Sequence, residues 1–231
     1  MAARHSGVGR PKGADLENSS RRRKQLMDAA VASIAEHGLS STTLATVARA
    51  SGLSQGTLVF YFKTKEMLLA EAFQQRMEEY QQATRDAINE AGDDPVDRII
   101  GATFAALDPE ILSFNNLALW NEFWPEAARS QGLKTAFERI EAERQAMMRA
   151  IFEDGRELLS GSAWTPEIAA RAVETMIEGI WGRLYYSAAH ISFKDAVQIM
   201  SLLLSTILPA HTDAIMKRAN TLTRPEQETK A

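Results

Sequence analysis

Apolar residues recur at intervals of three and four along almost the whole chain, and this spacing limits what the chain can form. Leu26, Ala30 and Ile34 belong to one such series, and Leu44 and Val47 belong to another. The spacing places apolar side chains on one face of an α-helix, whereas a half-buried strand needs strict alternation. No convincing run of alternating β-branched residues interrupts it, so the sequence predicts an all-α fold.

Prolines and capping residues divide this pattern into nine predicted helices. Asp94-Pro95, Asp108-Pro109 and Thr165-Pro166 each put a capping side chain before a proline at the first helical position, where its missing N–H costs nothing. Trp124-Pro125 is expected to end a helix, because the residue before proline disfavours helical backbone. The predicted helices span residues 21–37, 43–50, 54–61, 65–90, 95–107, 109–124, 130–154, 166–189 and 193–208.

Charge is divided unevenly along the chain. Residues 1–65 hold 10 Lys and Arg against 4 Asp and Glu, a balance of +6, whereas residues 66–231 hold 16 against 26, a balance of −10; together they give the overall −4. Neutralising phosphates drives the binding of basic proteins to nucleic acid. We therefore expect only the N-terminal part to contact a polyanion. The alternative is a solvated basic tail without a target.

The chain lacks the residues that several classes of function require. The chain has no cysteine, and its four histidines are scattered without metal-ligand spacing. It also lacks a glycine-rich phosphate loop and a nucleophile elbow. We expect no enzyme activity, no metal and no cofactor. No run approaches the roughly 18 apolar residues of a membrane span, and the N-terminus has no apolar signal region, so a cytoplasmic location is expected.

The first 62 residues carry the most specific signal, a helix-turn-helix. Gly38 suits the left-handed position that ends a first helix. Gly52 supplies the positive φ that the corner between the next two helices needs. The third helix would then be the recognition helix, whose N-terminal side chains face base edges in the major groove of DNA.

Residues 42–65, TTLATVARASGLSQGTLVFYFKTK, resemble the signature of the TetR family of transcriptional repressors over its whole length. The resemblance implies that the third helix lies in the major groove and that Tyr61 and Lys65 hold phosphates. The residues agree: Gln55 suits paired hydrogen bonds to adenine, and Thr57 suits a base edge or a thymine methyl.

Further contacts are expected around this helix. The Thr43 hydroxyl suits the DNA backbone, and Arg10 lies in a basic arm of the kind that enters a narrow minor groove. The basic run at 21–24 could meet phosphates, although for it and for the arm a solvated charge run is the alternative. Val59 and Phe60 either contact DNA or belong to the core. The predicted DNA contacts are Thr43, Ser54, Gln55, Thr57, Val59, Phe60, Tyr61, Lys65 and Arg10.

The resemblance also implies a homodimer. The last two long helices would form a four-helix bundle with those of a second copy, and two recognition helices would then read a palindromic operator. We predict a flexible basic arm at 1–19, a helix-turn-helix domain at 20–65, a ligand-binding and dimerisation domain at 66–218, and a frayed tail at 219–231.

Two aromatic clusters indicate a ligand site. Trp120, Phe123 and Trp124 share one helical face, and Glu178, Trp181 and Tyr185 share another. Aromatic faces with a carboxylate are the chemistry that holds a quaternary ammonium group. The segments ALWNEFWPEA and IEGIWGRLYYS resemble the choline-responsive repressors of the glycine-betaine pathway, a branch of the same family. The alternatives are a core or dimer interface, and a neutral or anionic ligand held by Arg183 and His190.

The sequence thus predicts a dimeric, sequence-specific repressor whose operator affinity is modulated by a small molecule, choline or a related quaternary ammonium compound. The competing prediction is a TetR-shaped protein-binding module that has lost DNA binding.

Overall fold

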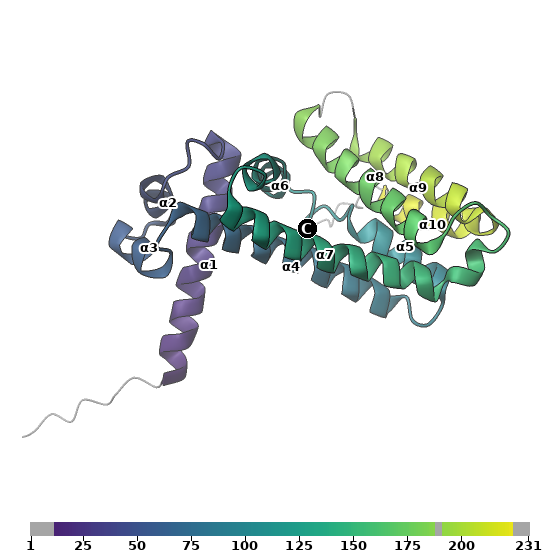
Figure 1. Ribbon diagram of the computed structural model, residues 1–231, viewed down its shortest axis with the longest axis horizontal. Helices are drawn as coiled ribbons and strands as arrows, with labels where there is room; N and C mark the ends of the chain where they lie inside the picture. The colour runs from purple at the N-terminus through teal and green to yellow at the C-terminus, as the bar shows by residue number, and fades with distance from the viewer. Residues whose placement is uncertain (1–11, 188–190, 224–231) are drawn as a thin grey trace, which may run out of the picture. The chain divides into compact units, whose positions relative to one another are not determined.

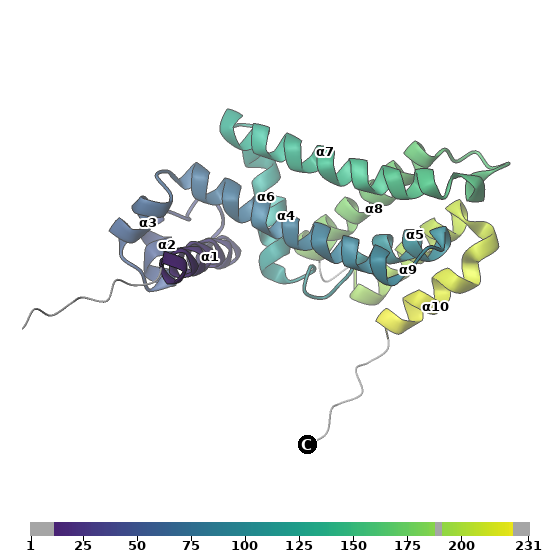
Figure 2. The same ribbon diagram turned by 90° about the horizontal axis from the view of Figure 1, so that it is seen from below.

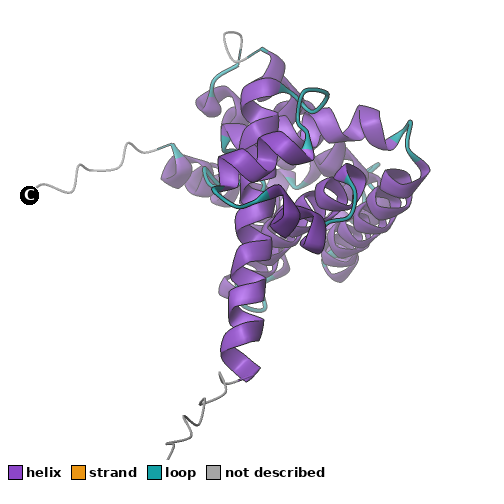
Figure 3. Ribbon diagram, turned by 90° about the vertical axis from the view of Figure 1, so that its left-hand side faces the viewer, coloured by secondary structure: helices purple, strands orange, loops and turns teal. Residues whose placement is uncertain are grey.

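The computed structural model describes residues 12–187 and 191–223, and the regular structure of these residues is entirely helical (Figures 1 and 3). The chain divides into two compact units, residues 1–72 and 73–231. The described α-helices are α1 (Lys12–His37), α2 (Leu44–Ser51), α3 (Gln55–Tyr61), α4 (Lys65–Glu90), α5 (Pro95–Ala105), α6 (Phe114–Ala127), α7 (Gln131–Asp154), α8 (Pro166–Tyr186), α9 (Phe193–Ile207) and α10 (Thr212–Leu222).

The N-terminal unit is built on a small apolar core. α1 packs against α2, and α2 against α3. The glycines at the two corners have the predicted left-handed backbone, with φ of 79° at Gly38 and 69° at Gly52. The buried core residues of this unit are Leu26, Ala30, Val47, Ala48, Leu58, Phe62 and Leu68.

α1 begins at Lys12, earlier than the predicted Arg21, so part of the predicted flexible arm is helical. Ala14, Leu16 and Glu17 are strong helix formers. Extending a helix that the core already holds also needs no new nucleus. The predicted boundary was wrong because it relied on the scarcity of apolar residues before residue 20. A helix can extend beyond its buried segment without apolar residues. Residues 1–11, with Arg10, lie outside the described residues.

The second unit is a helical bundle. α7 packs against α8, α6 and α5, and α9 packs against α8 and α10. Figures 1 and 2 both show α8 and α9 side by side, with α10 beside α9. No helix of the described residues is both long and apolar enough to cross a bilayer.

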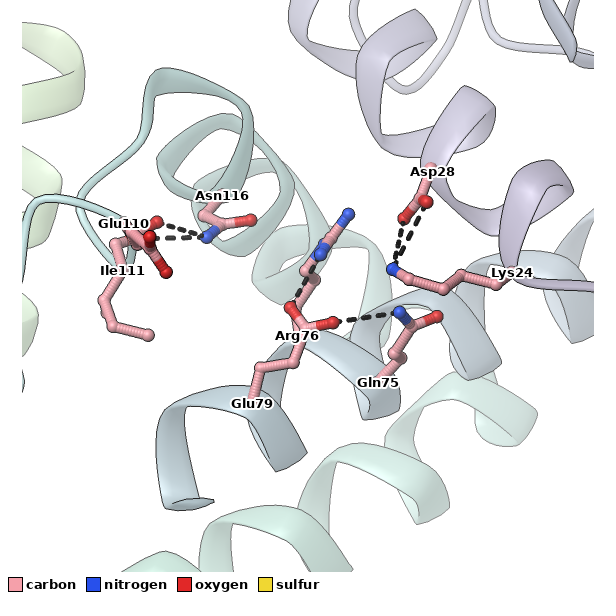
Figure 4. Close-up of polar contacts among 8 residues, drawn as sticks. All are labelled: Lys24, Asp28, Gln75, Arg76, Glu79, Glu110, Ile111 and Asn116. Atoms are coloured by element: carbon pink, nitrogen blue, oxygen red, sulfur yellow. Dashed lines mark hydrogen bonds and ion pairs between the residues drawn. The ribbon is translucent and has the colours of Figure 1, made fainter. Parts of the chain in front are cut away.

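α6 differs from the prediction at its beginning. It begins at Phe114 and not at Pro109, because Asp108 caps a turn: its carboxylate accepts from the Glu110 N–H at 2.8 Å. The side-chain amide of Asn116 then donates to the carbonyls of Glu110 and Ile111 at 3.1 and 3.3 Å, which holds that turn against the new helix (Figure 4).

α6 also continues through Pro125 to Ala127, and the prediction that it ends at Trp124 was wrong. Proline lacks the N–H that would bond the carbonyl four residues earlier, that of Asn121. The Tyr186 hydroxyl donates to this carbonyl at 3.4 Å. A contact from another helix therefore replaces the missing bond, which no local rule predicts.

α10 was not predicted. Pro209 ends α9 as expected, but a 3-10 turn at Pro209–His211 leads directly into α10 at Thr212. Ile215 and Ala219 are buried, and α10 packs against α9 and α5. The segment is therefore part of the bundle as far as Leu222, within the stretch predicted to be frayed.

Candidate DNA interface and ligand cavity

The N-terminal turn of α3 is capped and turned outward. The Ser54 hydroxyl accepts from the Thr57 N–H at 3.0 Å and shares a hydrogen bond with the Thr57 hydroxyl at 2.8 Å. On the other side of the helix, Leu58 is buried in the core. Gln55 is exposed on the outer face. Capping outside and burial inside thus fix which side chains α3 presents.

Two apolar residues of α3 lie on the surface of this unit. Val59 is 44% exposed and Phe60 is 79% exposed, so neither belongs to the buried core. The Phe60 ring meets the half-buried Tyr61 ring edge-on, with centroids 5.2 Å apart. Val59 and Phe60 thus form an exposed apolar pair next to the polar N-terminal turn of α3.

Thr43 and Lys65 already have partners within the unit. The Thr43 hydroxyl accepts from the Thr46 N–H at 3.1 Å, as half of a capping box that begins α2. The Lys65 ammonium donates to the Leu39 carbonyl at 2.6 Å. Both residues therefore hold the helix-turn-helix together, whatever they contact outside it.

Arg23, in the basic run at 21–24, points into the unit. Its Nε donates to a Glu71 carboxylate oxygen at 2.8 Å, and its guanidinium also pairs with the other oxygen. Its guanidinium carbon lies 4.8 Å from the centre of the Phe62 ring, a cation–π contact. Arg23 thus joins α1 to the start of α4 and to the end of α3.

In the second unit, three of the six predicted ligand residues are fully buried and stack on other rings. Trp120 and Trp181 stack with centroids 4.1 Å apart, and Tyr80 meets Trp181 edge-on at 5.2 Å. Phe123 stacks on Phe73 at 4.0 Å. Trp120, Phe123 and Trp181 are all fully buried, so in this structure they fill the core between α4, α6 and α8.

Two other predicted residues, Trp124 and Glu178, line a common cavity of about 460 Å³. Phe137 lies beside Trp124, with ring centroids 6.3 Å apart at a 71° angle. The full lining is Trp124, Phe137, Glu141, Gln145, Arg171, Glu174, Thr175 and Glu178. The remaining predicted residue, Tyr185, does not line this cavity: its hydroxyl donates to Glu122 at 2.9 Å, and burial with that carboxylate raises its pKa to about 12.

A buried arginine lies against the wall of this cavity. Arg144 is 3% exposed and stands among three glutamates. Its Nη2 donates to Glu141 at 2.6 Å and to Glu178 at 2.5 Å. Its Nη1 lies 3.5 Å from the Glu174 carboxylate, which is itself 5% exposed. One guanidinium thus serves three carboxylates.

The pKa values of Arg144, Glu174 and Glu178 reflect their burial and the excess of carboxylates over guanidinium. Burial raises the pKa of Glu174 to about 7, against the opposing pull of Arg144. Burial likewise raises the pKa of Glu178. Burial alone would lower the pKa of Arg144, but the surrounding carboxylates raise it overall, so it stays charged. Three carboxyl groups thus face one buried guanidinium beside two aromatic rings, and the site has an excess of negative charge when Glu174 is ionised.

Arg144, Glu141 and Glu174 were not predicted as site residues, although the sequence holds a signal for them. Arg144 interrupts an apolar series, because Ile140 and Met148 four residues to either side are both buried. A charged residue in such a series must be buried with partners. Glu174, one turn before Glu178, belongs to the same face of its helix.

Two family models match this chain, one in its N-terminal part and one in the remainder. A family model described as "Bacterial regulatory proteins, tetR family" matches residues 26–72, and one described as "BetI-type transcriptional repressor, C-terminal" matches residues 95–209. A protein of Stenotrophomonas maltophilia named "HTH-type transcriptional regulator BetI" is 31% identical over 168 residues, covering 70% of this chain and 80% of its own length. Its namesake from Paraburkholderia xenovorans is 28% identical over 177 residues, covering 77% and 88%.

Solved structures show the same fold. A putative transcriptional regulator from Pseudomonas aeruginosa superposes with a TM-score of 0.72 at 19% identity, covering 85% of this chain and 94% of that one. A putative transcriptional regulator from Saccharomonospora viridis, solved in complex with choline, gives a TM-score of 0.71 at 15% identity, covering 80% and 96%.

Proposed function

Because the chain belongs to the TetR family of transcriptional regulators, in its BetI-type branch, we propose that choline or a related quaternary ammonium ion is its effector. Regulators of this family bind DNA operators as homodimers and respond to small-molecule effectors. The chain is such a repressor and not an enzyme. Because a DNA-binding regulator acts where its operator is accessible, we propose that it works in the cytoplasm.

For DNA recognition we propose the exposed face of α3. Gln55 and Thr57 read base edges, and Val59 and Phe60 supply apolar contacts of the kind that suit thymine methyl groups. Thr43, Ser54, Tyr61 and Lys65 fix the register on the backbone, and Arg10 adds a minor-groove contact. The observation that supports this assignment is the exposure of Phe60 beside Gln55 on a helix whose opposite face is buried.

The dimer interface that we propose is formed by α8 and α9. Ile199 and Leu202 leave apolar surface exposed on α9, and Ile168 does so on α8. Gly179 on α8 has open space where a side chain would lie. A glycine inside a helix costs about 1 kcal/mol relative to alanine, a cost that close approach by a second copy would offset.

The effector site that we propose is the cavity lined by Trp124, Phe137 and the glutamates. A cation is attracted to the faces of the two rings and to the excess carboxylate charge. We propose a two-state mechanism in which the ligand binds better to a conformation with low operator affinity. α4 has residues in both units, and we propose that a shift of this helix links ligand binding to operator affinity. The observation that supports this site is the location of Trp124 and Glu178 in one cavity.

Thermal unfolding with three ligands tests the effector class. We expect choline and betaine aldehyde to stabilise the protein by roughly 2.7 kcal/mol at 100 times their dissociation constants. The neutral isostere 3,3-dimethylbutanol should give far less, because it has the shape without the charge.

Trp124→Ala should abolish the shift, whereas Trp164→Ala, away from the cavity, should leave it. A shift that survives Trp124→Ala would move the site elsewhere. No shift with any of the three compounds would exclude choline as the effector and leave the DNA-binding assignment unchanged.

A further inference from the structure

We propose that the cavity is a proton-linked cation site, in which a permanent cation displaces the proton that Glu174 carries when the site is empty. The proposal rests on the proposed function, because the cation is the effector. It assigns Glu174 as the residue that distinguishes a permanent cation from a neutral molecule of the same shape.

Arg144 is shared unequally among the three glutamates. The Nη2 of Arg144 is committed to Glu141 and Glu178 at 2.6 and 2.5 Å. Its Nη1 stands 3.5 Å from Glu174 without a hydrogen bond between them. Within the described part of the chain, both Arg144 Nη1 and Glu174 Oε1 are buried with no hydrogen-bond partner. Glu174 is therefore the least compensated of the three carboxylates.

Glu174 faces charged groups from α7 and from its own helix, α8. α7 provides Arg144 and Glu141, and α8 provides Glu178 and Arg171. Arg171 is exposed and already pairs with Glu167 at 3.1 Å. Two carboxylates thus offset the one buried cation.

The charges that act most strongly on Glu174 come from α7 and α8, and no charged side chain of α4, α6 or α9 is among them. Tyr80 on α4 is neutral, because burial raises its pKa to about 12. α6 contributes Trp124 to the cavity, an aromatic surface without charge. A Glu174 carboxylate in these surroundings holds its proton up to near neutral pH, with a pKa of about 7.

Binding of the cation and loss of the Glu174 proton are linked. A permanent cation at the Trp124 and Phe137 rings favours the ionised carboxylate, so Glu174 releases its proton to solvent on binding. Below about pH 7 the binding reaction must include that release. Affinity should therefore rise with pH, by about tenfold from pH 6 to pH 8 when the pKa starts near 7. A neutral ligand gives Glu174 no reason to ionise.

Isothermal titration of the full-length protein with choline tests the proposal. Titrations at pH 6 in two buffers of different ionisation enthalpy measure the protons released. We expect close to one proton per choline at pH 6 and close to none at pH 8. Glu174→Gln should bind choline more weakly at pH 8, release no proton, and show a nearly flat pH dependence. The matched control, Glu153→Gln, removes an exposed carboxylate of α7 that does not line the cavity, and it should behave like the wild type.

Ligand-free unfolding provides a second readout that also checks the fold of the variant. A carboxyl whose pKa is raised on folding contributes most stability below its unfolded pKa, and loses that contribution as pH rises towards 7. The wild type should therefore lose stability relative to Glu174→Gln between pH 5 and pH 8.

The outcomes separate the two proposals. Choline binding with equal affinity at pH 6 and pH 8, and without proton release, would overturn the proton linkage while choline remains the effector. Absence of choline binding at both pH values would overturn the effector and, with it, the linkage.

Discussion

The basic side chains of the N-terminal unit divide between internal and external roles. Arg23 is bonded to Glu71 and lies over Phe62, and Lys65 ties the start of α4 to the Leu39 carbonyl. Removing either would disturb the unit itself as well as its affinity for DNA. Gln55 has no such internal role among the described contacts, and it is therefore the better residue for a test of sequence recognition.

At this scale we predict that Gln55→Ala changes which operator is preferred. A lost bidentate contact with adenine removes about 1–3 kcal/mol of discrimination at one base pair in each half-site. Tyr61→Phe, which keeps the ring and removes only the hydroxyl, should weaken all sequences alike. Operator selection from a random library followed by affinity measurement separates the two effects. If the Gln55→Ala protein selected an unchanged operator, the assignment of this residue to base reading would be wrong.

At the scale of elements, the local signals located most helices, and tertiary contacts decided the exceptions. Asp94 and Thr165 cap their helices as predicted, and α4 has its predicted bounds. The N-terminal turn of α3 could also be predicted, because capping and turn residues act within a few positions. The Asn121 carbonyl that Pro125 leaves without its helical partner instead accepts from Tyr186, which lies 61 residues after the proline.

The candidate ligand site could likewise be predicted only in part from local sequence patterns. The aromatic residues were found because rings are rare in this chain, and Trp124 and Glu178 do share a cavity. Spacing along one helix could not distinguish them from Trp120 and Trp181, which stack on one another. Arg144 comes from a different helix, so its grouping with Glu174 and Glu178 required the three-dimensional arrangement.

We predict that Tyr186→Phe destabilises the protein by roughly 0.5–1 kcal/mol, the value of one neutral hydrogen bond. In a Pro125→Ala background the cost should shrink, because the substituted alanine would supply the N–H that the Asn121 carbonyl lacks. Chemical unfolding of the two single variants and the double variant gives the coupling. Purely additive effects would show that Tyr186 does not compensate for the proline.

At the scale of the whole molecule, the N-terminal residues that bind a polyanion are basic and the effector-binding remainder is acidic, with balances of +6 over residues 1–65 and −10 over residues 66–231. The acidic remainder repels DNA and attracts a cation. In the proposed mechanism, the operator and the effector therefore bind to different parts of the chain.

This division predicts a steep salt dependence for operator binding. Counterions released from the phosphates should lower the affinity by at least about a hundredfold between 50 and 200 mM salt. Fluorescence anisotropy of a labelled operator measures this slope, and a scrambled duplex of equal length serves as the control. A shallow slope would mean that the basic N-terminal part does not neutralise phosphates.

The positions of the tryptophans have a spectroscopic consequence. Trp120 and Trp181 are stacked and fully buried, whereas Trp124 lines the cavity beside the glutamates. A chain in which Trp124 is the sole indole, with the other three replaced by phenylalanine, would emit from the cavity wall alone. Its emission would then change with the charge next to it, so that occupancy of the site is recorded by the protein without an added label.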